Sequence, residues 1–294
     1  VLGLIILVIS VLYSGQVVMP MKEVAGSIAM ISSGDFNETM QITGYSEAED
    51  ISDKFNSMLS VLQNLEDARQ EFVSNVSHEL KTPITSVKVL AESLIGQENV
   101  PVELYQEFMV DINEELERMN KIINDLLTLV KMDKNASEVN ISEVNINEFL
   151  EAILKQLQPI ADKRNIEMIF ESVRSVTAQV DEVKLAMAFR NLIENAIKYN
   201  YDNGWVRVSL NADHKFFYLK VSDSGVGIPE ELQDSIFERF YRVDKARSRE
   251  TGGNGLGLAI TRNAILLHRG SIKVHSIEQQ GTTFAVRIPL MYSE

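Results

Sequence analysis

The sequence predicts a multidomain chain in which an all-α, dimeric helical part is followed by an α/β sandwich domain. Two observations predict this order. In residues 51–95 and 108–130, apolar side chains recur at steps of four and three, the spacing of helices that pack in bundles. After a polar linker at residues 135–145, helical patterns alternate instead with short β-rich runs, which indicates a sheet covered by helices.

Composition excludes several classes of function. The chain has 294 residues and is 45% hydrophobic, which is enough for about two or more compact units. A net charge of -14 argues against a nucleic-acid partner, because phosphates would be repelled. The absence of cysteine excludes disulfides and cysteine-bound metals and fits domains in a reducing compartment, and 4 histidines make a histidine-rich metal site unexpected.

Residues 1–19 are predicted to be a truncated transmembrane helix. Residues 1–21 carry no charged side chain, and Lys22 is the first charge, as expected on the cytoplasmic side of a membrane. A signal peptide is the alternative, but no basic segment precedes the apolar run and no clear cleavage site follows it. Because the chain does not begin with Met, we expect a fragment whose sensor region lies upstream of Val1.

Residues 20–66 are predicted to form two short amphipathic helices joined by a polar connector. The first helix ends at Gly34-Asp35-Phe36, since Gly commonly stops a helix. Each helix is too short to bury its apolar stripe alone, so this segment implies dimerisation. The apolar positions are Val24, Ile28 and Ile31 in the first helix, and Ile51, Phe55, Met58, Leu62 and Leu65 in the second.

Residues 67–134 are predicted to form a hairpin of two long helices. The first helix continues from the preceding seam to about Ile95, and residues 96–101 make the turn. One hairpin would leave an apolar face in water, whereas two hairpins from two chains would close a four-helix bundle. The apolar stripes are Phe72, Val76, Leu80, Pro83 and Val87 in the first helix, and Phe108, Ile112, Leu116, Met119, Ile123, Leu126 and Val130 in the second.

His78 lies opposite the apolar stripe of its helix and is therefore predicted to point into solvent. Glu79 beside it could hold one ring nitrogen and leave the other nucleophilic. Thr82 shares the face of His78 one turn on, and Pro83 is expected to kink the helix there. His78 is thus a candidate nucleophile, and the alternative is a surface histidine on a structural coiled coil.

Residues 146–294 are predicted to form an α/β sandwich with a largely antiparallel sheet. The turn sequences Asp202-Asn203-Gly204 and Gln279-Gln280-Gly281 resemble hairpin connections between strands. The expected helices are 146–163, 182–200, 230–236 and 256–268, and the expected strands are 166–171, 176–180, 205–211, 215–222, 271–276 and 282–290.

Four segments of this half make chemical sense as one ATP site. Amide oxygens can ligate Mg²⁺ and a lysine can meet phosphate, a carboxylate can accept from the amine of adenine, and free amides at a helix start can hold an anion. The segments are Asn191, Asn195 and Lys198 on one helix side, Asp223-Ser224-Gly225-Val226-Gly227 after a strand, Gly252 to Gly257 before a helix, and Gly281-Thr282-Thr283 at the last strand.

Each segment alone has an ordinary explanation, such as a solvated helix or a common turn. A dinucleotide-binding motif is not indicated, because the polar residues 247–250 and no strand precede the glycine-rich segment, and no Walker lysine motif occurs. The order and spacing of all four segments together predict the nucleotide site.

The chain resembles bacterial membrane-bound sensor histidine kinases of two-component systems. Residues 20–66 resemble a HAMP domain, with Pro20, Gly34-Asp35-Phe36 and Glu49-Asp50-Ile51 at its recognisable positions. Residues 65–290 resemble the kinase core, whose ATP-binding domain belongs to the superfamily of histidine kinases, gyrase and the heat-shock chaperone. The matching boxes are Phe72 to Pro83, Asn191 to Asn200, Asp223 to Gly227, Phe237-Glu238-Arg239-Phe240, and Gly253 to Gly257.

The resemblance implies that His78 receives the γ-phosphoryl group of ATP, with Glu79 orienting it or accepting its proton. It implies that Asn195 ligates Mg²⁺, that Asp223 holds adenine, and that residues 237–255 form a mobile lid. The nucleotide-binding residues implied are Asn191, Asn195, Lys198, Tyr199, Asp223, Gly225, Gly227, Ile228, Phe240, Arg242, Arg247, Gly253, Gly255, Leu256, Gly257, Leu258 and Thr282.

The resemblance also implies the partners and the place of action. We expect a homodimer anchored in the bacterial cell membrane, with a cytoplasmic kinase core and a cytoplasmic response regulator as partner. Asn191 stands where the gyrase and chaperone ATPases have a water-activating Glu, which favours transfer to His78 over hydrolysis. Thr82 implies a second, phosphatase activity on the regulator, and the alternative function is a catalytically silent dimeric relay.

Overall fold

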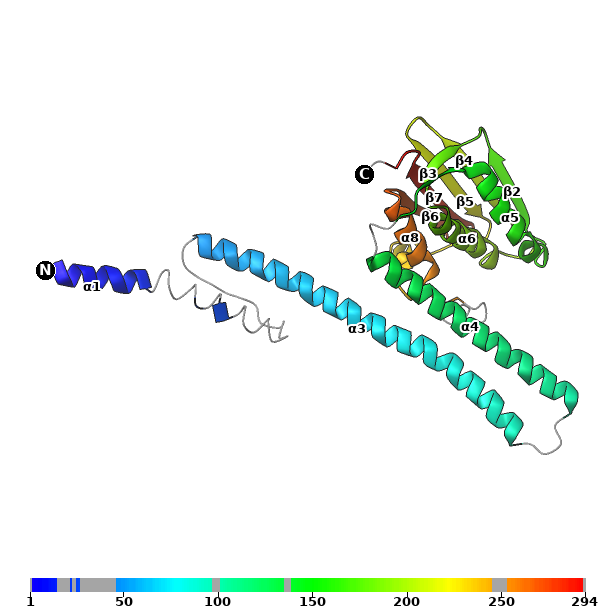
Figure 1. Cartoon of the computed structure of the whole chain (residues 1–294), viewed down its shortest axis with the longest axis horizontal. Coiled ribbons are helices and arrows are strands. Elements are labelled where there is room, and N and C mark those ends of the chain that lie inside the picture. The colour runs from blue at the N-terminus through cyan, green and yellow to red at the C-terminus, as the bar shows by residue number, and fades with distance from the viewer. Residues whose placement is uncertain are drawn as a thin grey trace. The chain divides into compact units, whose positions relative to one another are not determined.

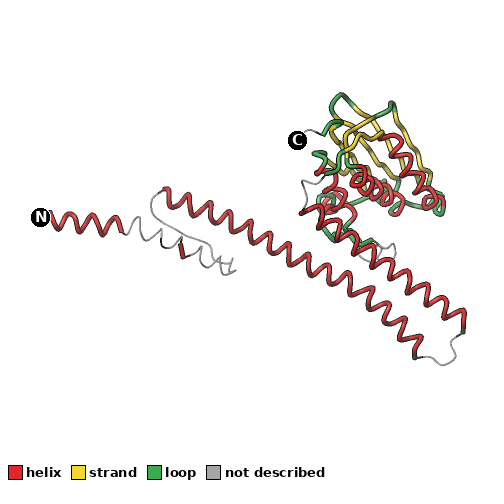
Figure 2. Tube along the Cα trace, in the orientation of Figure 1, coloured by secondary structure: helices red, strands yellow, loops and turns green. Residues whose placement is uncertain are grey.

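A computed structural model of the chain describes residues 2–14, 22, 25–26, 46–96, 101–134, 139–244 and 253–292 (Figure 1). It divides into two compact units, residues 1–77 and residues 78–294. A helical region is followed by an α/β domain, as predicted (Figure 2). Most of the predicted HAMP segment before Ser46, including Pro20 and Gly34-Asp35-Phe36, lies outside the described residues.

The first unit begins with helix α1, Leu2–Tyr13, whose twelve residues include no charged side chain. Its described side chains are exposed throughout. Among the described residues, none of the helices combines the length and the apolar character that crossing a bilayer requires.

Helix α3, Ser46–Ile95, runs without interruption for 50 residues and includes both the predicted second HAMP helix and the histidine helix. Within it, Pro83 is buried and Phe72, Val76, Leu80 and Val87 are half-buried, which is the predicted stripe. Because proline has no N–H, Pro83 leaves the carbonyl of Glu79 without its usual helical donor.

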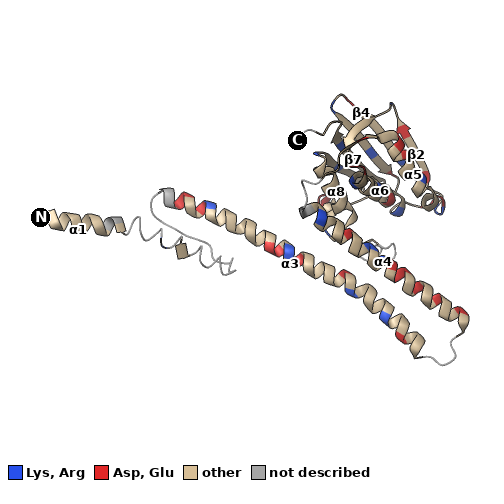
Figure 3. Cartoon of the chain, viewed as in Figure 1, with Lys and Arg blue, Asp and Glu red and all other residues tan. Residues whose placement is uncertain are grey.

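Helix α4, Val102–Lys134, is the second helix of the predicted hairpin. Ile122, Leu129 and Met132 are buried, and the amino-terminal half of the helix is strongly acidic (Figure 3). Several large apolar side chains remain exposed in the single chain, as expected if a second copy covers them. They are Tyr105, Met109, Val110, Leu116, Ile123, Leu127 and Val130.

The α/β domain has a five-stranded sheet in the order β2-β4-β5-β7-β6, in which only the β2–β4 pair is parallel. Helices α5, α6 and α8 pack against this sheet (Figure 1). The helices are α5 Ile146–Asp162, α6 Glu182–Lys198 and α8 Gly257–Leu267, and the strands are β2 Glu167–Ser172, β4 Trp205–Ala212, β5 Phe216–Asp223, β6 Ser271–Ile277 and β7 Gly281–Pro289.

Strand alternation places the core between the helices and the sheet. In β4, Val206, Val208 and Leu210 are buried while the residues between them face outward. Helix α6 buries Leu185, Phe189 and its neighbours against the same layer. The predicted two-layer α/β sandwich with a largely antiparallel sheet is therefore confirmed, and its strand ends carry the loops described below.

Three local predictions were wrong: the polar linker, the helix at 230–236 and the hairpin at residues 202–204. The predicted linker contains a strand, β1 Ser142–Asn145, which pairs with β3 Thr177–Val180 in a separate two-stranded sheet. Two short 3₁₀ turns, Glu230–Leu232 and Ser235–Phe237, replace the helix expected at 230–236.

The turn at residues 202–204 leads from α6 into β4 and joins no hairpin. The true β4–β5 hairpin is at residues 213–215, where the Asp213 side chain accepts hydrogen bonds from the backbone N–H groups of Lys215 and Phe216. The predicted hairpin at Gln279-Gln280-Gly281 is confirmed between β6 and β7.

Candidate functional site

A cavity of about 860 Å³ lies among α6, the loop after β5, and the segment before α8. This volume is in the range of small-molecule sites in proteins. Its wall brings together all four of the segments that the sequence predicts for an ATP site. It also includes two residues of α4, Lys121 and Asp125, which the sequence did not predict.

Asp223 ends β5 and forms the polar floor of the cavity. Its Oδ1 accepts hydrogen bonds from the backbone N–H groups of Gly225 at 2.9 Å and Thr282 at 3.2 Å. Within the described chain, Oδ2 has no hydrogen-bond partner, so this oxygen is left to accept from a ligand. Burial raises the pKa of the Asp223 carboxyl to about 6, although the two backbone hydrogen bonds oppose the rise.

Two glycines let the backbone pass close to this carboxylate. A Cβ on Gly225 would stand 2.3 Å from the carbonyl oxygen of Tyr199. Gly227 has φ +70° and a Cβ there would stand 2.1 Å from the carbonyl oxygen of Ile277. The loop after β5 is thus packed between the end of α6 and the end of β6, where only glycine fits at these two positions.

Helix α6 supplies Asn191, Asn195 and Lys198 to another wall of the cavity. The amide of Asn191 donates to the carbonyl of Gly257 at 3.2 Å, and the Asn195 side chain has no hydrogen bond within the described residues. Burial lowers the pKa of the Lys198 ammonium; Tyr199 opposes this, and the cations Lys121 and Arg242 lower it further.

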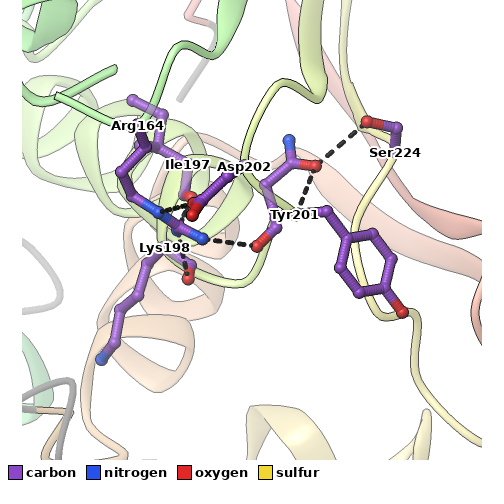
Figure 4. Close-up of polar contacts among 7 residues, drawn as sticks. Arg164, Ile197, Lys198, Tyr201, Asp202 and Ser224 are labelled. Carbon is purple, nitrogen blue, oxygen red and sulfur yellow. Dashed lines mark hydrogen bonds and ion pairs between the residues drawn. The ribbon is translucent and has the colours of Figure 1, made fainter. Parts of the chain in front are cut away.

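The carboxyl end of α6 is fixed by Arg164, which follows α5 (Figure 4). The Arg164 guanidinium donates to the carbonyls of Ile197 at 2.7 Å, Lys198 at 2.9 Å and Asn200 at 2.8 Å, and to the Asp202 carboxylate at 2.9 Å. One side chain therefore donates to three carbonyls at and just after the end of the helix.

The segment 253–257 closes the cavity ahead of α8. Gly255 has φ +71°, and its carbonyl accepts from the backbone N–H of Phe240 at 2.9 Å. Among the described residues, no side chain accepts a hydrogen bond from the backbone N–H groups of Gly257 or Leu258, so these first amide groups of α8 are available to an anion at the cavity wall.

His78 is exposed on α3, as predicted. The Thr82 hydroxyl donates to the carbonyl of His78 at 3.1 Å. The Glu79 carboxylate pairs with Arg242 at 2.5 Å, and in the described chain it makes no hydrogen bond to the His78 ring. Arg242 is nearly buried, lines the cavity, and its Nε has no partner among the described residues.

Most of the predicted nucleotide-binding residues do line this cavity. Gly225, Phe240 and Leu256 are not among the residues that line it, and Arg247 lies outside the described residues. The cavity residues among the predicted set are Asn191, Asn195, Lys198, Tyr199, Asp223, Gly227, Ile228, Arg242, Gly253, Gly255, Gly257, Leu258 and Thr282.

Asn254 lies in the predicted glycine segment, although no role was predicted for its side chain. The sequence did not predict these charged residues of the cavity wall: Lys121, Asp125, Arg164, Glu194, Asp244 and Glu278. The two α4 residues looked like ordinary polar positions of a heptad, and Arg164 like a charge after a helix. No periodicity marks them, because their roles depend on contacts between segments far apart in the chain.

Two protein families match the chain. Residues 68–135 match the His Kinase A (phospho-acceptor) domain, and residues 180–291 match the histidine kinase-, DNA gyrase B- and HSP90-like ATPase domain. The chain belongs to the histidine kinase family. His78 lies within the phospho-acceptor match, and Asp223 and Asn195 lie within the ATPase match.

Curated relatives of this chain are sensor protein kinases named WalK. The protein of Staphylococcus epidermidis is 36% identical over 281 residues, covering 94% of this chain and 44% of the relative. A protein of Staphylococcus aureus is 37% identical over 276 residues, covering 92% of this chain and 64% of the relative. The chain thus spans only part of the length of the relatives it matches.

Solved structures show the same fold. The Acinetobacter baumannii histidine kinase AdeS gives a TM-score of 0.60 at 23% identity, covering 72% of this chain and 98% of that one. The histidine kinase ThkA in complex with the response regulator protein TrrA gives 0.63 at 24% identity, covering 78% of this chain and 64% of that one.

Proposed function

We propose that this chain is the signalling and catalytic part of an ATP-dependent protein-histidine kinase. It phosphorylates His78 from Mg-ATP, passes the phosphoryl group to an aspartate of a response regulator, and also dephosphorylates that regulator. Family membership and the sensor kinases among its relatives support this proposal.

The observation that carries the proposal is the ion pair between Arg242 and Glu79. Arg242 lines the cavity that contains the unpaired oxygen of Asp223, and Glu79 is the chain neighbour of His78. This contact holds the helix turn of the acceptor histidine against the wall of the candidate nucleotide site. The candidate nucleotide cavity and the phosphate-accepting His78 therefore belong to one compact unit, residues 78–294.

Different residues of the chain bind the adenine, balance the phosphate charge and accept the phosphoryl group. Asp223 accepts from the adenine amine, Lys198 and Arg242 balance phosphate charge, and the amides at the start of α8 hold phosphate oxygens. A neutral ring nitrogen of His78 forms the new N–P bond as the bond from the γ-phosphorus to its bridging oxygen breaks. The proton of the other ring nitrogen passes to Glu79 or to water.

The donor set fits a magnesium ion carried in with the nucleotide. The Asn195 amide oxygen lines the cavity without a hydrogen bond, and Glu194 lies beside it. Within the described residues, no cluster of three or more His, Cys, Asp or Glu side chains could bind a metal by itself. Mg²⁺ prefers a few protein oxygens completed by phosphate and water, and when bound it neutralises phosphate charge.

The surrounding architecture is proposed from the sequence. Residues 20–66 are a HAMP relay, residues 1–19 are the end of a membrane anchor, and the kinase core faces the cytoplasm. The exposed apolar side chains of α4 support a homodimer closed through a four-helix bundle. The complex of ThkA with a response regulator supports a partner of that class.

Two rival functions remain testable against this proposal. A catalytically silent dimeric relay would neither become labelled with phosphate nor release it from ATP. An ATPase of the gyrase or chaperone type would release free phosphate steadily without labelling the chain. Incubation with ATP labelled at the γ-phosphate separates them when protein-bound label and free phosphate are both counted. We expect label on wild type, none on His78→Ala, and little free phosphate; equal labelling of both proteins would overturn the proposal.

A further inference from the structure

Helix α4 forms part of the wall of the nucleotide cavity. Lys121 and Asp125 stand one helical turn apart on α4 and line the same cavity as Asn191 and Lys198. Helix α4 also packs on α8, whose first turn borders that cavity. The hairpin that carries the acceptor histidine therefore takes part in building the donor site.

A single side-chain contact connects α4 to the glycine segment 253–257. The Asn254 amide donates to Oδ2 of Asp125 at 2.6 Å. Asn254 is only 8% exposed, and its own Oδ1 accepts from the backbone N–H of Leu256 at 3.1 Å. Asn254 thus uses both ends of its amide, one toward α4 and one toward the start of α8.

The glycine segment is held from its other side by residue 240. The backbone N–H of Phe240 donates to the carbonyl of Gly255, which has φ +71° and no room for a side chain. Asp125 contacts Asn254, Phe240 contacts Gly255, and Asn191 contacts Gly257, so the segment is held at three successive points. Without the α4 contact, the amide nitrogen of Asn254 would lose its partner, and the segment would be held only at Gly255 and Gly257.

Both cations and carboxylates line the cavity beside Asp125. Lys121, Lys198 and Arg242 face the same cavity, and Lys121 and Arg242 both disfavour the charge on Lys198. Burial raises the pKa of the Asp125 carboxyl, whereas Asn254 and Lys121 oppose the rise. A carboxylate is thus kept half-buried beside cations, where it aligns a neighbouring loop.

We propose that Asp125 is a positioning residue of the nucleotide site: by accepting the hydrogen bond of Asn254, it holds residues 253–257 in the conformation that binds nucleotide phosphates. This inference rests on the proposed function and extends it. Nucleotide affinity then depends on the docking of α4 against α8. By reciprocity, bound nucleotide strengthens that docking by the same factor.

The test is an exchange of the two polar groups in the full chain. Asp125→Ala removes the acceptor, and Asn254→Asp sets two carboxylates against each other. Asp125→Asn combined with Asn254→Asp restores one donor and one acceptor, keeps the total charge, and leaves an oxygen at position 254 for Leu256. Asp111→Asn on the exposed face of α4 is the matched control.

The measurement is the dissociation constant of a fluorescent ATP analogue, with autophosphorylation of His78 followed in parallel. We expect Asp125→Ala to weaken binding about tenfold and Asn254→Asp to weaken it further. The exchange variant should return to within about threefold of wild type, as should Asp111→Asn. Loss of affinity should appear in KM for ATP more than in kcat.

Three results would overturn the inference. The first is wild-type affinity in Asp125→Ala, even if its thermal stability falls. The second is an exchange variant that binds no better than Asn254→Asp alone, and this comparison decides the matter if Asp125→Ala does not fold. The third is a wild-type chain that binds no analogue, which would overturn the proposed function itself and is distinguishable from the other two.

Discussion

Replacing Asp223 by Asn should raise the stability of the folded chain and lower its affinity for ATP. The substitution keeps the shape of the side chain and the oxygen that accepts from Gly225 and Thr282. It replaces the free oxygen that faces the cavity with an amide nitrogen, which donates. The new amide nitrogen at position 223 and the amine of adenine are both hydrogen-bond donors, so they cannot pair with each other.

The magnitude follows from burial and hydrogen bonding. Burial raises the pKa of Asp223 from 3.8 to about 6, so keeping its charge in the unliganded protein costs about 3 kcal/mol above that pH. Because the folded pKa exceeds the unfolded one, this cost grows as pH rises from about 4 to about 6. Losing a charge-assisted hydrogen bond to adenine should cost about 1.5–3 kcal/mol of binding, or about 10- to 100-fold in affinity.

The assay combines urea denaturation with nucleotide binding. Near neutral pH, Asp223→Asn should unfold at higher urea than wild type, and this gain should shrink as pH falls below about 6. ATP binding should weaken, and discrimination against GTP should narrow, because the new amide can donate to the carbonyl oxygen of guanine. Asp234→Asn, an exposed aspartate without a side-chain cap, is the control that should change neither property.

Two results would refute this reasoning. If Asp223→Asn bound ATP as tightly as wild type, the Asp223 carboxylate would not be the adenine acceptor. If the variant lost ATP binding because it was less stable than wild type near neutral pH, the burial argument would be wrong.

Three further predictions concern the supporting residues. Arg164→Ala should lower the free energy of unfolding, measured in urea, by about 2–4 kcal/mol, because three carbonyls and a carboxylate lose this donor. Arg164→Lys should restore only part of that free energy, because an ammonium cannot donate to several carbonyls in the way that a planar guanidinium does. A loss below about 0.5 kcal/mol in Arg164→Ala would contradict this prediction. Thr82→Ala should leave autophosphorylation largely intact and impair dephosphorylation of the response regulator, whereas equal loss of both would refute the assignment. Burial lowers the pKa of His268, whose neutral ring accepts from the backbone N–H of Asp181 at 2.8 Å, so the stability it provides should be lost as pH falls below about 6.5. Relative to His268→Gln, wild type should therefore lose stability in urea titrations between near-neutral and mildly acidic pH, and a constant difference would contradict the burial argument.

Periodicity predicted the long elements well because their apolar faces repeat over many turns. Helices α3 and α4 each carry a stripe that only a helix can collect on one side, and β4 alternates buried and exposed residues as a half-buried strand must. The exposure of His78 followed from the same geometry, since its position lies opposite the stripe.

Elements that depend on distant partners could not be predicted in this way. Strand β1 is four residues long and mostly polar, and it exists because β3 pairs with it. The turn at residues 202–204 has the composition of a hairpin, but the Arg164 contacts make it the exit of α6. Local sequence gives no signal of either partner.

In the candidate site, too, some residues were predicted from local sequence and others depend on contacts between distant segments. Its glycines and Asp223 were predicted because backbone geometry and adenine chemistry restrict those residue types. Asp125 was not predicted, and neither was the role of the Asn254 side chain within the predicted glycine segment, because the 2.6 Å contact between them exists only in the folded chain. Arg242 was predicted as a phosphate contact, and its pairing with Glu79 emerged only from the structure.

The central claim is that one exposed imidazole receives a phosphoryl group from the cavity beside it. The most direct test is to locate the phosphate after incubation with Mg-ATP, by fragment mass spectrometry at neutral to alkaline pH, among the 4 histidines of the chain. We expect acid-labile, alkali-stable phosphate at His78 and unmodified His214, His268 and His275. Phosphate at another residue, or none on a chain that binds ATP, would contradict it.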